Sequence, residues 1–124
     1  MRSGKPSNME KRAINCPKCS MKMEEISFAG IELDSCPFCS GCWLDAEEVS
    51  QMTRSRGNAK LRVELQSPSK SDLNCPRCRP HHAMQVGPHV DIATLQLDQC
   101  THCGGVWLDR GELTTLLSYR NPAN

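Results

Sequence analysis

The chain has 124 residues, a formal net charge of +1, nine cysteines and only five aromatic side chains. A charge this close to neutral argues against a polycation that binds nucleic acid through charge alone. No apolar run approaches the roughly 20 residues of a membrane helix. Segments of about 40 residues with so few large apolar side chains need a metal or disulfides, because they bury too little surface. The composition thus excludes small modules that are stabilised by hydrophobic burial alone.

Residues 1–13 are predicted to form a flexible basic arm, which carries Arg2, Lys5, Lys11 and Arg12. The arm has no apolar signal region, so we expect a cytoplasmic protein without a membrane partner. In a reducing compartment, closely spaced thiols bind metal more often than they form disulfides. The cysteine pairs are therefore interpreted as metal ligands rather than as a disulfide framework.

The first module, residues 14–56, contains two Cys-x-x-Cys pairs separated by 16 residues. Between the pairs, apolar and polar residues alternate as in a β-hairpin, with a turn at Ala29-Gly30. After the second pair, Asp45 and Glu48 have the spacing of a helix N-cap and of the acid that reaches back to it. The predicted metal ligands of this module are Cys16, Cys19, Cys36 and Cys39.

Residues 57–73 are predicted to be a linker, because Gln66-Ser-Pro-Ser-Lys-Ser71 is a composition that does not bury itself. Gly57 suits the end of the first helix. The alternation of Leu61, Val63 and Leu65 leaves open an extra strand or contact in this segment.

The second module, residues 74–119, repeats the pattern and is followed by a short tail, residues 120–124. The motif Trp43-Leu-Asp45 recurs as Trp107-Leu-Asp109, and Glu112 follows where Glu48 followed before. Here 21 residues separate the pairs, and the insertion is expected to be a loop. That outgoing stretch contains Pro80, His81, His82, Gly87, Pro88 and His89. The predicted metal ligands of this module are Cys75, Cys78, Cys100 and Cys103.

Four thiolates at about 2.3 Å hold zinc tetrahedrally and leave no position for water, so each predicted site is closed and structural. We expect two Zn²⁺ ions, one per module. Eight thiolates and two zinc ions lower the formal net charge to about −3. The metal-loaded protein is therefore expected to be weakly acidic.

Cys42 aligns with Val106 and is interpreted as a ninth, non-ligand thiol that is buried like a small hydrophobe. It also completes the spacing Cys36-x-x-Cys39-x-x-Cys42, which is typical of an iron–sulfur cluster. We favour zinc, because the second module has no counterpart of this third cysteine.

The remaining chemistry-bearing residues have a structural and a functional interpretation. The histidines His81, His82, His89 and His102 are expected to be exposed, with a weak second metal site as the alternative. Trp43 and Trp107 are expected to seal each small core rather than to stack on bases. Helix capping explains the spacing of the acids Asp45, Glu48, Asp109 and Glu112 without catalysis.

Cys-Pro-x-Cys, a hairpin, Cys-x-x-Cys-x-Gly-x-Trp-Leu-Asp and then Glu together resemble the TFIIB-type zinc-ribbon family, which is common in bacterial proteins. The resemblance covers both modules. The second copy is closer, since the first departs at Ser40, Cys42, Ala46 and Glu47 without touching a ligand. The resemblance implies zinc binding and a small metal-stabilised α+β fold of two tandem zinc ribbons. Each ribbon is then a β-hairpin with two cysteine knuckles, followed by a short α-helix.

The resemblance implies no particular activity, since a shared fold is a weak guide to function. We expect a non-enzymatic adaptor that binds a protein partner, in transcription or another macromolecular assembly, without a prediction of its oligomeric state. The alternative is nucleic-acid binding through the arm and through Arg54, Arg56, Lys60 and Arg62, aided by Lys18, Lys22, Arg77 and Arg79 near the knuckles. Thiol redox chemistry and zinc handling form a lesser alternative.

Overall fold

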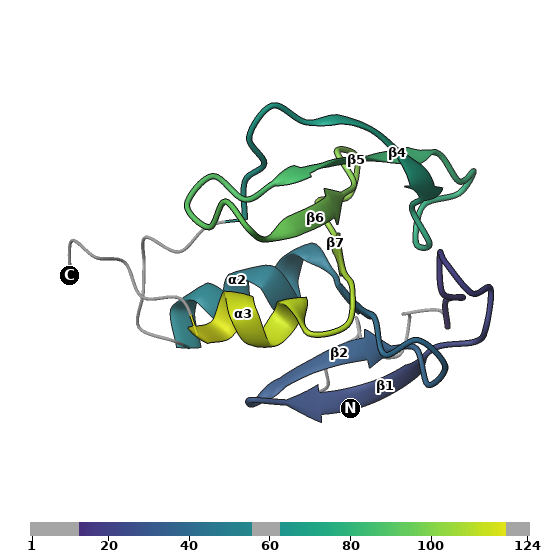
Figure 1. Ribbon diagram of the computed structural model, residues 1–124. Coiled ribbons are helices and arrows are strands. Elements are labelled where there is room, and N and C mark those ends of the chain that lie inside the picture. Colours follow the sequence, from purple (N-terminus) through teal and green to yellow (C-terminus); the bar gives the residue numbers. More distant parts are fainter. Residues whose placement is uncertain (1–12, 56–62, 119–124) are drawn as a thin grey trace.

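The computed structural model describes residues 13–55 and 63–118 (Figure 1). The first module contributes β1 (Glu24–Phe28), β2 (Ile31–Ser35), β3 (Cys42–Leu44) and α2 (Ala46–Ser55). The rest of the chain contributes β4 (Ser69–Asn74), β5 (Ala83–Pro88), β6 (Gln96–Gln99), β7 (Val106–Leu108) and α3 (Glu112–Ser118). The chain is thus a small α+β fold, with more strand than helix. Neither described helix is long and apolar enough to cross a membrane.

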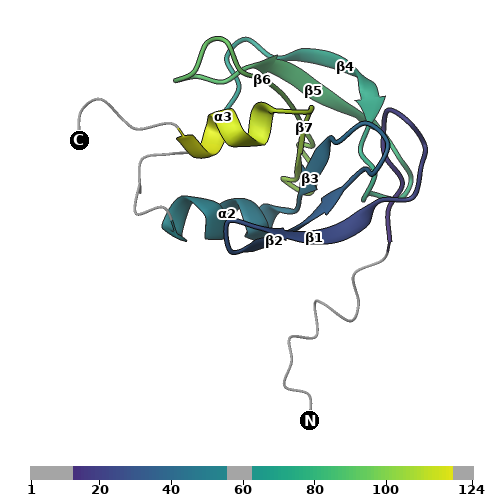
Figure 2. The ribbon, with the colours of Figure 1, turned by 60° about the horizontal axis from the view of Figure 1, so that its bottom comes forward.

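The strands of both modules form one seven-stranded sheet, in the order β1-β2-β3-β7-β6-β5-β4. The modules join where β3 pairs with β7 in antiparallel register, with Trp43 opposite Trp107. Cys42 is opposite Leu108, and Leu44 is opposite Val106. An approximate two-fold axis between the two tryptophans therefore relates β3 to β7. Figure 2 shows β3 and β7 between the two hairpins. The two modules are therefore the two halves of a single sheet.

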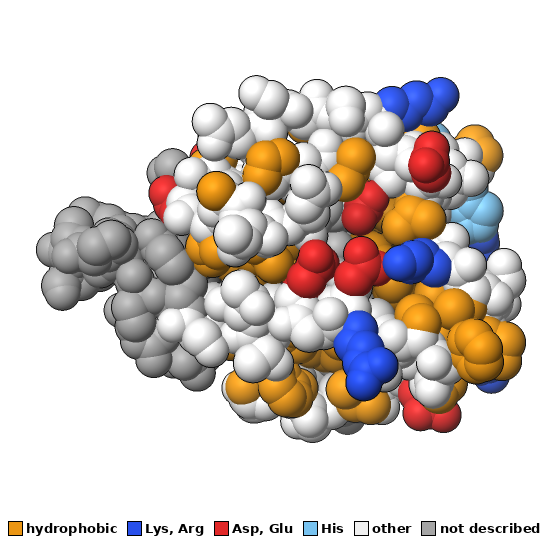
Figure 3. Space-filling view, viewed as in Figure 1, with side chains coloured by type: hydrophobic (Ala, Val, Ile, Leu, Met, Phe, Trp, Pro, Cys, Tyr) orange, Lys and Arg blue, Asp and Glu red, His pale blue; other side chains and the backbone are white. Residues whose placement is uncertain are grey.

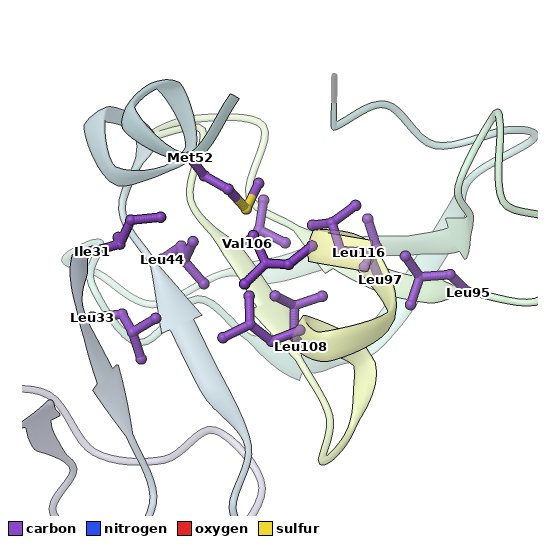
Figure 4. Packing of buried hydrophobic residues seen from close by; sticks show 11 residues of the cluster. Ile31, Leu33, Leu44, Met52, Leu95, Leu97, Val106, Leu108 and Leu116 are labelled. Carbon is purple, nitrogen blue, oxygen red and sulfur yellow. The ribbon is translucent and has the colours of Figure 1, made fainter. Parts of the chain in front are cut away.

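One face of this sheet packs against the helices. Because side chains alternate along a strand, Leu44, Val106 and Leu108 point to this face, where Met52 of α2 and Leu116 of α3 meet them (Figure 4). The remaining buried members of this core are Ile31, Leu33, Leu95, Leu97, Leu113 and Leu117. Within the described ranges, α2 and α3 thus cover one continuous apolar core.

At both predicted helix starts, the acid reaches back to the backbone of the capping aspartate, which is one half of a capping box. The backbone N–H of Asp45 donates to Oε1 of Glu48 at 2.9 Å, and that of Asp109 donates to Oε1 of Glu112 at 2.8 Å. The hairpin turn predicted in the first module is also confirmed, since Phe28 pairs with Ile31 around Ala29 and Gly30.

The other face carries the two tryptophans, and each belongs to the packing of the opposite module. A Cβ atom added at Gly41 would lie 2.2 Å from the indole ring of Trp107, and one at Gly105 would lie 2.2 Å from that of Trp43. Both indoles are fully buried. We expected each tryptophan to seal its own module; instead each one crosses the two-fold axis and covers a glycine of the other module.

The segment predicted as a linker, residues 57–73, is structured from Val63 onward. Backbone N–H groups of Gln66 and Val90 donate to Pro88 and Glu64, at 2.7 and 3.0 Å, and Leu65 bridges His89. Strand β4 then pairs with β5. The polar composition indicated a linker, but an edge strand is also commonly polar, because it needs few buried side chains. The alternative of an extra strand or contact is the better description here.

The five-residue insertion of the second module lies in the turn between β5 and β6. This turn spans residues 89–95, whereas two residues connect β1 to β2. Gly87 and Pro88, which were expected in a loop, belong to β5. His89 was expected to be exposed but is fully buried. Its Nδ1 accepts the N–H groups of Asp91 and Ile92 at 3.0 and 3.3 Å, which satisfies this buried ring nitrogen.

Several predictions fall on residues outside the described ranges. These are the arm up to residue 12, the helix end at Gly57, the basic residues Arg56, Lys60 and Arg62, and the tail 120–124.

The glycine contacts lead to a first prediction. Gly41→Ala and Gly105→Ala should each lower the free energy of unfolding of the zinc-loaded protein by about 3 kcal/mol, because the added methyl group overlaps a buried indole. Chemical denaturation measures the loss. In a Trp107→Phe background the overlapping ring atoms are gone, so Gly41→Ala should cost markedly less. An equal cost in both backgrounds would contradict the contact.

Candidate metal centres

Each Cys-x-x-Cys pair forms a knuckle, defined here as the tight turn that contains both cysteines. The first sulfur of every knuckle accepts two backbone N–H groups, at 3.2–3.4 Å. Positive φ angles of 64° at Ser20, 67° at Ser40 and 79° at Gly104 close three of the turns. Each knuckle thus holds its first sulfur in a rigid turn, and the two amide hydrogen bonds stabilise a thiolate there against the opposing effect of burial.

The eight predicted ligands gather in two sets of four. Within each set, Cys16/Cys19/Cys36/Cys39 and Cys75/Cys78/Cys100/Cys103, all sulfurs lie within 4.8 Å of one another. Sulfur pairs are 3.8 Å apart for Cys16 and Cys39, and 3.7 Å apart for Cys78 and Cys100. Tetrahedral zinc with bonds of about 2.3 Å requires sulfur separations of about 3.8 Å, whereas a disulfide requires about 2.05 Å. All nine cysteines are free, and the two sets fit two structural zinc ions.

The thiols of the second set differ in acidity. Burial raises the pKa of Cys75, Cys78 and Cys103 to about 11. Burial also acts on Cys100, but hydrogen bonds from the Cys103 N–H, from His82 and from the His102 N–H outweigh it and lower the pKa of that thiol to about 6. Since most of these thiols are protonated near neutral pH, zinc binding has to release protons and becomes weaker in acid.

Cys42 is separate from the first set of sulfurs. It lies on β3 between Gly41 and Trp43 and packs against the helix-side core. Burial raises the pKa of its thiol. The interpretation as a non-ligand thiol agrees with this position, and the iron–sulfur alternative would need Cys42 beside Cys36 and Cys39.

The knuckles also carry two cations that cross to the opposite module. Arg77 lies in the first knuckle of the second module, and Lys18 occupies the same position in the first. Arg77 donates from Nε and Nη2 to Asp45 at 3.1 Å, and from Nη2 to Asp34 at 3.2 Å. Lys18 Nζ donates to Asp109 at 3.0 Å. Both residues were candidates for phosphate contacts, and in the structure each one pairs with a carboxylate of the other module.

The aspartates of the two Trp-Leu-Asp motifs therefore do more than cap helices. Asp45 Oδ1 accepts Trp43 Nε1 at 2.9 Å, and Asp109 Oδ1 accepts Trp107 Nε1 at 3.1 Å. Each of these carboxylates thus holds the indole of its own module and a knuckle cation of the other. Sequence analysis missed this role, although the matched basic residues at positions 18 and 77 are its signal.

A comparison with known protein families matches one family model in two regions, residues 15–55 and 74–119. Its description is "transcription factor zinc-finger", the TFIIB-type zinc ribbon. The chain belongs to this family. Its two zinc ribbons coincide with the two sets of cysteines described above. No curated protein and no solved structure gives a significant match to the chain.

The separation of Cys42 from the zinc ligands leads to a second prediction. Cys36→Ala should lose the zinc of the first ribbon in the presence of a chelator that the wild-type protein resists, because three thiolates remain. Cys42→Ser should keep two zinc ions under the same conditions, since this sulfur lies outside the set. Native mass spectrometry counts the ions. A Cys42→Ser protein with one zinc ion would refute the assignment.

The crossed cations lead to a third prediction. Arg77→Ala should lower the free energy of unfolding by about 3 kcal/mol, because it removes a cation that faces two carboxylates in a largely buried site. Lys18→Ala should cost less than about 1 kcal/mol, because the side chains of its pair are 46 % and 43 % exposed. Chemical denaturation of both zinc-loaded variants measures the two losses in free energy of unfolding. Equal losses would contradict the prediction.

Proposed function

We propose that this tandem zinc-ribbon protein is a non-enzymatic adaptor that binds another protein, in transcription or another macromolecular assembly. The contact surface would be the knuckle end of the first ribbon. The observation that carries the proposal is the exposure of Met21 and Phe38, named here the apolar pair, which are 46 % and 75 % exposed.

Phe38 lies within a knuckle and Met21 lies just after one, where hydrogen bonds to the zinc-binding cysteines hold the backbone in place. The carbonyl of Met21 accepts the N–H of Cys16 at 2.7 Å, and the N–H of Phe38 donates to the sulfur of Cys36 at 3.4 Å. Ile26 and Phe28 of the edge strand β1 add further exposed apolar surface on the same ribbon. Figure 3 shows hydrophobic side chains gathered at the end of the molecule where the knuckles of the first ribbon lie in Figure 1. An aromatic side chain on a rigid base loses little freedom on binding, which suits a protein contact.

Two features support a role without catalysis. The zinc sites are closed by four thiolates, so neither has a position for an activated water. The four acids near the helix starts all have structural partners: Glu48 and Glu112 accept backbone N–H groups, and Asp45 and Asp109 bind tryptophan and the knuckle cations.

The described surface favours a protein partner over nucleic acid. The knuckle cations Lys18 and Arg77 face carboxylates of the opposite ribbon. Aromatic side chains stack on bases when they lie in a basic groove, but Trp43 and Trp107 are buried. Nucleic acid is therefore the alternative outcome of the test.

The fourth prediction tests the adaptor. A photoreactive benzoylphenylalanine at residue 38 of the full-length protein should cross-link to one protein in cells, whereas the same group at Thr114, exposed on α3, should not. Phe38→Ala should weaken binding of that protein, once purified, by about 10- to 100-fold, because a Phe side chain contributes about 1.5–3 kcal/mol on burial. Thr114→Ala is the matched control.

Stability should not confound this test, because Phe38 is largely exposed and the variant should keep two zinc ions. The proposal fails if Phe38→Ala binds the purified partner as tightly as wild type does. It also fails if position 38 cross-links to nucleic acid alone, with a steep salt dependence of binding.

A further inference from the structure

The two ribbons differ at one equivalent place, the surface above the zinc ligands. The carbonyl of His82 accepts the N–H of Cys75 at 2.8 Å, as the carbonyl of Met21 accepts that of Cys16. His102 precedes the last cysteine of its knuckle, as Phe38 does. His82 and His102, named here the histidine pair, therefore replace the apolar pair in the second ribbon.

The histidine pair lies against a zinc ligand. His82 Nε2 is 3.3 Å from the sulfur of Cys100, and the two imidazole rings have centroids 4.0 Å apart. One ring nitrogen of each histidine and the sulfur of Cys100 all lie within 4.8 Å of one another. His82 is half-buried and His102 is exposed, so solvent reaches this group from one side. Figure 3 shows exposed histidine side chains at the same end of the molecule as the knuckles of the first ribbon.

We propose that His82, His102 and Cys100 form an open binding site for a further divalent metal ion of the zinc type, with the Cys100 thiolate shared between this ion and the structural zinc. Two imidazoles and a thiolate are ligands that zinc and cobalt prefer. Bonds of about 2.0 Å to nitrogen and 2.3 Å to sulfur place tetrahedral ligand atoms about 3.5 Å apart. The 3.3 Å separation of His82 and Cys100 already matches this value.

Electrostatics favours the second ion. Four thiolates and one zinc ion carry a formal charge of −2, which attracts a cation at close range in a partly buried site. The first ribbon has the same thiolate charge, but the apolar pair offers it no comparable imidazole ligands. With three protein ligands the new site keeps one position for water, so its ion exchanges with solvent, unlike the closed structural sites.

A simpler role for His82 is a hydrogen bond to the Cys100 sulfur that supports the structural zinc. The two roles make different predictions. A support alone predicts that loss of His82 weakens the structural zinc and that no further ion binds. The open site predicts that loss of either histidine removes one added ion and leaves both structural ions in place.

The fifth prediction separates these roles with Co²⁺, whose mass distinguishes an added ion from an exchanged zinc. Full-length protein with two zinc ions is titrated with Co²⁺ and examined by native mass spectrometry. We expect Zn₂Co₁ for wild type, with a sulfur-to-cobalt charge-transfer absorption that reports the shared thiolate. His82→Ala and His102→Ala should each remain Zn₂, with at least a tenfold loss of cobalt affinity.

Two controls use the first ribbon. Phe38→Ala should still bind cobalt like wild type, because it changes the equivalent position on the other ribbon. The double substitution Met21→His with Phe38→His should add a second cobalt ion by rebuilding the site there. The proposal is overturned if wild type stays Zn₂ at excess Co²⁺, if the double variant His82→Ala/His102→Ala binds cobalt like wild type, or if either single His variant loses a structural zinc.

Discussion

The antiparallel pairing of β3 with β7 is the contact on which the rest of the molecule depends. It places Trp43 opposite Trp107 and brings each indole over a glycine of the other ribbon. A side chain at either glycine would overlap the facing indole and strain this strand pair. The same pairing aligns Leu44 and Val106 on the opposite face, where both helices pack. One short strand pair thus joins the metal-bearing face to the apolar core.

Metal binding and burial are linked through this contact. The first cysteine of each knuckle is buried in one cluster together with both tryptophans, so both zinc sites border the same packed group. Structural zinc contributes roughly 10–16 kcal/mol in small domains, which makes it a major part of the stability of each small ribbon. We therefore expect the two halves to fold as one cooperative unit, with each zinc ion supporting the packing around the other.

The sequence allowed the cysteine sets, the hairpin turn at Ala29-Gly30 and the Asp-to-Glu contacts at the helix starts to be predicted, because each depends on short, regular spacings in the chain. The joined sheet could not be read in this way, since β3 and β7 have only three residues each and meet across more than 60 positions. Gly41 and Gly105, each two residues before a tryptophan, are the sequence feature that indicates this contact. Edge strand β4 was hidden because a polar strand at a sheet edge has the composition of a linker.

The approximate two-fold axis has a consequence for how such a molecule can evolve. In a homodimer of single ribbons every substitution appears twice, so both ends of the assembly must carry the same surface. Because both copies here lie in one chain, each can change alone while the shared strand pair is kept. Two copies in one chain are thus not bound to be identical, and an apolar end and an imidazole end coexist on one scaffold.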